Sequence, residues 1–97
     1  PERAVGMIER GERTVIDVRT PAEYAEAHVL GALNIDVESD SFDALIADLD
    51  PDEAYLVYCR SGRRSAIAAD TMEKVGFTDV ADAGGLVDLV RAGAPIE

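Results

Sequence analysis

The sequence predicts a three-layer α/β fold in which a central, mostly parallel β-sheet is flanked by helices. Two apolar runs carry this prediction: residues 14–18 are mostly β-branched, and residues 54–58 are apolar and aromatic, as in buried strands. Segments with the apolar spacing of helices alternate with these runs. Such alternation is typical of βα units with parallel strands. The length of 97 residues predicts one domain over residues 1–97.

The first half of the chain predicts two helices and two strands. Residues 2–10 place Val5 and Ile8 on one helical face and end at Gly11, a residue suited to a helix C-terminus. The strand over residues 14–18 is followed by Pro21, which is permitted in the first turn of a short helix. Residues 31–35 predict a turn that leads into a short strand.

The second half continues the alternation. We expect an amphipathic helix with a solvated acidic face from Ser41 to the residue before Pro51. The strand over residues 54–58 precedes a helix over 63–75, a strand over 78–81, a turn at Gly84-Gly85 and a helix over 86–92. Ligands bind at the carboxyl ends of parallel strands, so chemistry is expected near Asp17, Arg19 and Cys59.

Composition excludes several classes of function. The net charge of −11 arises from 20 acidic and 9 basic residues and repels nucleic acids and anionic membranes, so neither is expected as a partner. The acidic surface fits either a high-salt environment or a basic protein partner. One cysteine and one histidine are too few for the usual zinc ligand set, and no metal or other cofactor is expected. No membrane-length apolar run or signal peptide is visible, and cytoplasmic localisation is expected.

The segment after the second buried strand gathers three of the nine basic residues around the only cysteine. Cys59 is followed by a short polar loop and then by the start of a helix, whose first N–H groups lack partners within the helix. A lone cysteine at a strand end is usually an inert core residue. Here a loop that curls over the sulfur would instead direct N–H groups at it, lower its pKa and bind small anions. The candidate anion-binding residues are Arg60, Ser61, Gly62, Arg63, Arg64 and Ser65.

Several ordered motifs resemble those of single-domain rhodaneses, a family of sulfurtransferases. The motifs are Ile16-Asp17-Val18-Arg19, His28 to Ile35, Tyr58 to Ser65, Gly76-Phe77, Gly84-Gly85 and Gly93 to Ile96. The chain departs from the family pattern at Ala27, Leu30 and Leu89, where Gly, Pro and Trp are common. The short first strand of the family would precede Pro1. These departures bear on substrate fit more than on the fold.

The resemblance implies covalent catalysis through a persulfide on Cys59, with thiosulfate or another persulfide as donor and cyanide or an external thiol as acceptor. It assigns the sulfonate oxygens of the donor to the arginines of the loop, without deciding which of them points inward; Arg64 is alternatively a tie between helix and sheet. Asp17 and Arg19 are candidate supporting residues, with the simpler interpretation that Arg19 pairs with Glu23 and Asp17 fixes a turn. His28 is expected to be a structural turn residue.

Three other functions stay open at this point. A phosphatase or arsenate reductase also uses a cysteine in an anion-binding loop, but that loop is longer than the four residues that separate Cys59 from Arg64. A non-catalytic docking module usually lacks the cysteine. A persulfide relay to a protein partner has the same motifs as a thiosulfate enzyme. The oligomeric state does not follow from the sequence.

Overall fold

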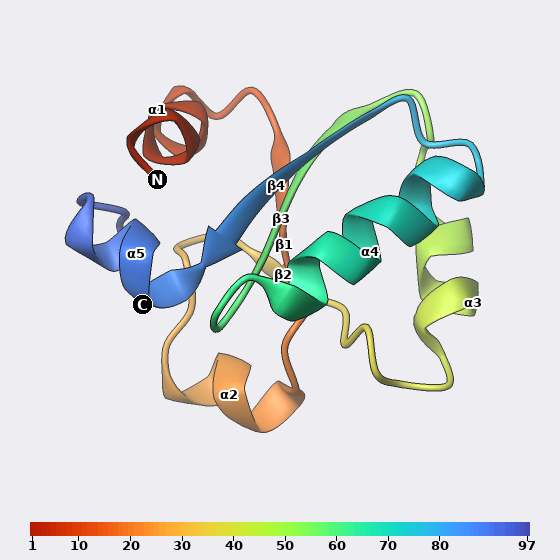
Figure 1. The fold of residues 1–97 in the computed structure, drawn as a ribbon, viewed down its shortest axis with the longest axis horizontal. Helices are drawn as coiled ribbons and strands as arrows, with labels where there is room; N and C mark the ends of the chain where they lie inside the picture. The colour runs from red at the N-terminus through yellow and green to blue at the C-terminus, as the bar shows by residue number, and fades with distance from the viewer.

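A single four-stranded sheet forms the centre of the computed structural model, which describes all 97 residues (Figure 1). The strand order is β2-β1-β3-β4, and every neighbouring pair is parallel. The strands are β1 (Thr14–Asp17), β2 (Leu33–Asn34), β3 (Ala54–Cys59) and β4 (Asp79–Gly85). The predicted α/β class with a parallel sheet is therefore confirmed.

Helices cover both faces of the sheet. They are α1 (Glu2–Arg10), α2 (Pro21–Glu26), α3 (Phe42–Ala47), α4 (Arg63–Lys74) and α5 (Leu86–Arg91). Figure 1 shows α3 and α4 on one side of the sheet and α1 and α5 on the other, which gives the predicted three layers. The longest helix, α4, has 12 residues, and no helix is long and apolar enough to cross a bilayer.

The central strand β3 is buried on both faces, and this explains its unbroken apolar sequence. Tyr55, Val57 and Cys59 belong to the apolar cluster that includes side chains of α3 and α4. Tyr58 belongs to the opposite cluster, together with side chains of α1 and α5. Successive side chains of a strand point to opposite faces, so a strand between two helical layers needs apolar residues at every position.

The double glycine is not the separate turn that the sequence predicts. Gly84 and Gly85 are the last residues of β4, and α5 begins directly after them at Leu86. The ladder between β3 and β4 shifts register between Val57 and Cys59, so that Gly85 lies opposite Cys59. The expectation fails because pairing with a neighbouring strand extends β4 through an irregularity of the bulge type.

Candidate functional site

The carboxyl ends of three neighbouring strands meet at one edge of the sheet. There β1 ends at Asp17, β3 at Cys59 and β4 at Gly85. The chain leaves β3 through residues 60–62 and enters α4 at Arg63, and residues 60–65, which include the first turn of α4, form the loop around Cys59. The edge thus holds the three residues that sequence reasoning marked: Asp17, Arg19 and Cys59.

The loop after Cys59 turns back over the sulfur. The side chain of Cys59 is completely buried. The N–H of Gly62 donates a hydrogen bond of 2.9 Å to Sγ, and Oγ of Ser65 lies 3.6 Å from the same atom. Gly62 has a φ of 102°, in the left-handed region that side-chain-bearing residues rarely adopt. The glycine therefore allows the tight turn that directs its N–H at the thiol.

Two opposing influences set the pKa of Cys59. Burial is the larger single influence and raises the pKa because it disfavours the charged thiolate. Hydrogen bonds from the Ser65 side chain and from the backbones of Ser65, Gly62 and Ser61 act in the other direction. Together they outweigh burial, and the pKa lies below the ordinary value of a thiol. The arrangement favours the thiolate, which is the nucleophilic form of cysteine.

The three loop arginines differ in their partners. Arg64 forms a two-pronged ion pair with Glu23, with N···O distances of 2.7 and 3.0 Å. Arg60 and Arg63 are exposed and make no side-chain hydrogen bond or ion pair. Arg64 is thus tied to α2, not to the sheet as the sequence suggested. The two cations with free hydrogen-bond donors are Arg60 and Arg63.

The partner of Arg64 is fixed by the start of α2. Thr20 and Glu23 form a reciprocal capping box, in which each side chain bonds the other residue's backbone N–H. The ion pair with Arg64, followed by the capping contacts, outweighs partial burial and lowers the pKa of Glu23 to about 2. The Thr20-x-x-Glu23 spacing is the sequence signal for this role, and sequence reasoning assigned Glu23 to Arg19 instead.

Two hollows flank the loop. One has a volume of about 340 Å³ and is lined by Val37, Glu38, Ser61, Arg63, Arg64 and Ile67. The other has a volume of about 210 Å³, and its lining includes Arg19, Arg60, Leu86 and Val87. Arg63 thus lines one hollow and Arg60 the other, and each hollow also contains carboxylates: Glu38 in the first, Glu23 and Glu26 in the second.

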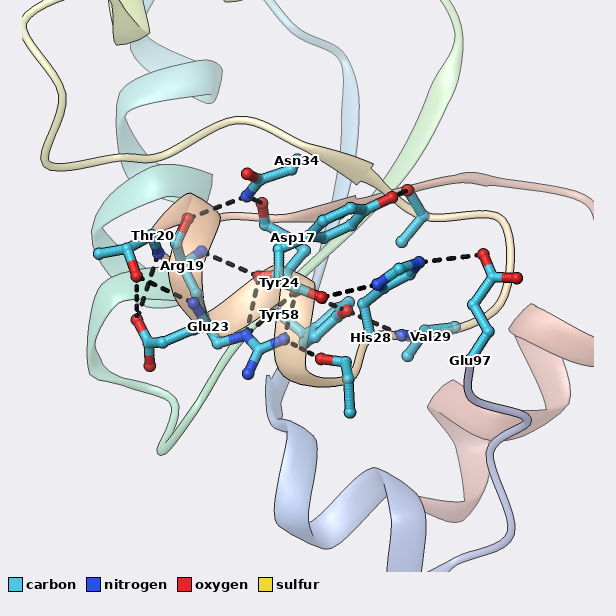
Figure 2. A network of polar contacts seen from close by, with 12 residues as sticks. Asp17, Arg19, Thr20, Glu23, Tyr24, His28, Val29, Asn34, Tyr58 and Glu97 are labelled. Carbon is cyan, nitrogen blue, oxygen red and sulfur yellow. Dashed lines mark hydrogen bonds and ion pairs between the residues drawn. The ribbon is translucent and has the colours of Figure 1, made fainter.

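A closed polar network lies next to the loop (Figure 2). Arg19 donates to both carboxylate oxygens of Asp17, at 2.9 Å from Nε and 2.7 Å from Nη2, and the hydroxyl of Tyr58 donates to Oδ2 at 2.8 Å. The Tyr58 hydroxyl also accepts a hydrogen bond from the N–H of Val29, and Nη2 of Arg19 also donates to the carbonyl of Ala27. Every buried polar side-chain atom is hydrogen-bonded. Burial raises the pKa of Tyr58 well above its ordinary value.

The simpler interpretation of Asp17 and Arg19 is half correct. Asp17 does fix a turn, because its Oδ1 accepts the backbone N–H of Arg19 at 2.9 Å. The predicted partner of Arg19 is wrong: Arg19 pairs with Asp17, and Glu23 pairs with Arg64. Tyr58, which completes the network, was missed, since an apolar strand gives no sign that a tyrosine hydroxyl has a buried partner.

His28 has the structural role expected from its sequence position. Its ring stacks on Tyr24 at a centroid distance of 3.7 Å, and Nδ1 lies 2.8 Å from the carbonyl oxygen of Tyr24. Nε2 lies 2.9 Å from a carboxylate oxygen of Glu97 (Figure 2). With an acceptor at each nitrogen, led by the Tyr24 carbonyl, the pKa of His28 is raised despite partial burial. None of these contacts involves Cys59.

The fold and this site define a class of protein: a parallel α/β domain with a buried thiol under a loop that carries exposed arginines. The chain belongs to the rhodanese family, because the family described as the rhodanese-like domain matches residues 1–91.

Curated relatives of this chain carry the name thiosulfate sulfurtransferase, among them PspE and GlpE. PspE of Escherichia coli is 39% identical over 74 residues, which are 76% of this chain and 71% of PspE. GlpE of Pseudomonas putida is 34% identical over 97 residues, which are the whole of this chain and 86% of GlpE. A solved structure described as a rhodanese with anions from E. coli superposes with a TM-score of 0.74 at 35% identity, covering 88% of this chain and 96% of that one.

Proposed function

We propose that this protein is a sulfurtransferase that carries sulfane sulfur on Cys59. The observation that carries the proposal is the hydrogen bond of 2.9 Å from Gly62 N–H to the buried Sγ, within a loop that offers two unpaired arginines. The relatives named thiosulfate sulfurtransferase support thiosulfate as a donor. The first step requires Cys59 as a reduced thiol. Because the cytoplasm keeps thiols reduced, this requirement favours the cytoplasm as the compartment.

The first half-reaction forms a persulfide. The thiolate of Cys59 attacks the sulfane sulfur of the donor, a new S–S bond forms, and the old S–S bond breaks so that sulfite leaves with its electron pair. The N–H groups of Ser61, Gly62 and Ser65 stabilise the anionic sulfur before and after transfer. Arg60 and Arg63 receive the sulfonate oxygens, because their forked N–H groups have no protein partner.

The second half-reaction returns the enzyme to its starting state. Cyanide or the thiolate of an external acceptor attacks the terminal sulfur of the persulfide, and Cys59 leaves as the thiolate. The products are thiocyanate or a persulfide of the acceptor. The chain has one cysteine, so the acceptor thiol must come from outside it.

Three other residues hold the site in place without touching the reacting sulfur. Arg64 is held by Glu23 and fixes the start of α4 against α2. Asp17 and Arg19 fix the end of β1 beside Cys59. We assign these residues a supporting role, whereas Arg64 is among the candidate substrate-binding residues predicted from the sequence.

The test is the intact mass of the protein after incubation with thiosulfate. We expect a gain of about 32 Da that cyanide removes and that the Cys59→Ser variant lacks, as covalent catalysis requires. No gain with thiosulfate or with any other sulfane donor would overturn the proposal in favour of a docking module. Hydrolysis of an aryl phosphate that Cys59→Ser abolishes would indicate the phosphatase alternative instead.

A further inference from the structure

The end of β4 lies directly against the backbone of the catalytic loop. Gly85 is buried opposite Cys59 and has a φ of −101° and a ψ of 144°, an ordinary extended conformation. Any residue can adopt these angles, so backbone conformation does not explain the glycine. The explanation must lie in what surrounds it.

A side chain at position 85 would collide with the loop. A Cβ built on Gly85 would lie 2.5 Å from the carbonyl oxygen of Arg60 and 3.1 Å from the Cα of Ser61. Both atoms belong to the backbone, which cannot rotate away as a flexible side chain can. The loop occupies the space that glycine leaves free, as expected where two backbones approach closely.

Gly84, the residue before Gly85, lies against the far end of the loop. The Cα of Gly84 lies 3.6 Å from the position of a Cβ on Gly62, and the Gly84 carbonyl accepts a hydrogen bond of 3.4 Å from the Ser65 hydroxyl. Gly62 and Ser65 both place polar groups next to Sγ. Movement of the loop away from β4 would therefore move these donors relative to the sulfur.

We propose that Gly85 is a positioning residue for sulfur transfer. Because Gly85 has no Cβ, the backbone of the loop can pack against β4, and this contact places the Gly62 N–H within hydrogen-bond distance of the thiol. Gly85 has no side chain with which to bind the sulfur donor, so its role is to position the loop. The role of Gly85 in sulfur transfer rests on the proposed function. The geometric claim itself, that Gly85 sets the surroundings of the thiol, holds for any reaction of Cys59.

The experiment compares Gly85→Ala with the unchanged protein by the pH dependence of alkylation with iodoacetamide. We expect the thiol pKa to rise by about one unit, a tenfold change in the thiolate-to-thiol ratio at neutral pH. Arg64 is the charged side chain that interacts with the thiolate, and its ion pair with Glu23 stays outside the altered contact. Alkylation needs no sulfur donor, so this readout survives even if the protein proves not to be a sulfurtransferase.

Gly93→Ala is the matched control. Gly93 has a φ of 102°, and a Cβ there would meet no atom within 4 Å, so the substitution strains the backbone without touching the loop. We expect Gly93→Ala to lose stability and to keep the thiol pKa of the unchanged protein. An unaltered thiol pKa in a folded, destabilised Gly85→Ala would overturn the proposal and reduce Gly85 to a packing residue.

Asp82→Ala decides the question if Gly85→Ala does not fold. The exposed Asp82 accepts the Gly84 N–H at 2.9 Å and so restrains the irregular end of β4 without contacting the loop. We expect a smaller rise of the thiol pKa, about twofold in the thiolate-to-thiol ratio. An alkylation profile identical to that of the unchanged protein would then overturn the proposal.

Discussion

Two polar clusters lie side by side at the carboxyl edge of the sheet and use their charges in opposite ways. In the first, Asp17, Arg19 and Tyr58 are buried and satisfy one another. In the second, the loop after Cys59 leaves Arg60 and Arg63 exposed and without partners. Both clusters begin at the end of a buried strand, so their position in the fold does not explain the difference.

The protein itself completes the first cluster, whereas the proposed function assigns the completion of the second cluster to a ligand. Five of the nine basic residues are paired with carboxylates, namely Arg10, Arg13, Arg19, Arg64 and Lys74. In a chain with 20 acidic residues, a cation without a carboxylate is the exception. Two of the four exceptions flank the thiol, where the proposed anionic donor would approach. We infer that the first cluster serves stability and the second serves binding.

The largest expected effect is the loss of stability in Asp17→Ala. The substitution leaves the buried Arg19 cation and the Tyr58 hydroxyl without their acceptor, and breaking a buried ion pair in this way costs about 3–5 kcal/mol. Urea unfolding measures the loss. Asp17→Asn keeps part of the hydrogen bonding and should lose less. A loss below about 1 kcal/mol for Asp17→Ala would mean that the network contributes little.

In the loop, removal of an arginine charge should weaken substrate binding and leave stability nearly unchanged. Arg60→Gln and Arg63→Gln should each raise the KM for thiosulfate about tenfold, the value of roughly one charge-assisted hydrogen bond, and leave unfolding nearly unchanged. Arg3→Gln is a control, because Arg3 is also an unpaired cation in the first turn of a helix but lies far from the loop in α1. An unchanged KM in both loop variants would contradict the assignment of the donor anion to these arginines.

Glu23 is paired with Arg64 but is only partly buried. Its contribution to the free energy of unfolding should therefore depend on pH. Its folded-state pKa of about 2 lies below the ordinary 4.5, so the ion pair with Arg64 stabilises fully above pH 4.5 and is lost as pH falls through 2. We expect Glu23→Gln to cost roughly 1 kcal/mol at pH 6. The difference in urea midpoint between Glu23→Gln and the unchanged protein should shrink as pH is lowered from 5 to 2.5. A difference independent of pH would indicate a packing effect alone.

The smallest effect is expected at His28. Its pKa is raised above 6.5, so the stabilisation from the charged ring is full below pH 6.5 and is lost as pH rises through the folded-state pKa. Because Glu97 is half exposed, the effect should be about 0.5 kcal/mol. Titration of the His28 ring by NMR measures the shift directly, and Glu97→Gln should reduce it. A ring that titrates at or below 6.5 would contradict the contact.

Sequence reasoning predicted the sheet, the helices and the loop, because these depend on local patterns. The alternation of apolar runs and amphipathic helices depends on neighbouring residues, and so does the loop after Cys59. The pairing of charged side chains depends on residues that are brought together only in the folded chain. Asp17 and Glu23 were both within reach of Arg19, and only the folded chain shows that the capping box turns Glu23 toward Arg64. The role of Gly85 depends on a loop 25 residues earlier in the chain, which no local pattern reveals.

The burial of Cys59 separates how strongly the sulfur reacts from which molecules it meets. Its side chain has no solvent-exposed surface, so a reagent reaches it only if the loop yields enough room. Intrinsic nucleophilicity depends on the thiolate fraction, whereas access depends on the dimensions of the attacking molecule. Reagents should therefore be ranked by size as well as by electrophilicity: cyanide and iodoacetamide enter where a bulky aromatic disulfide is held back. We therefore expect the loop to select reagents by their size.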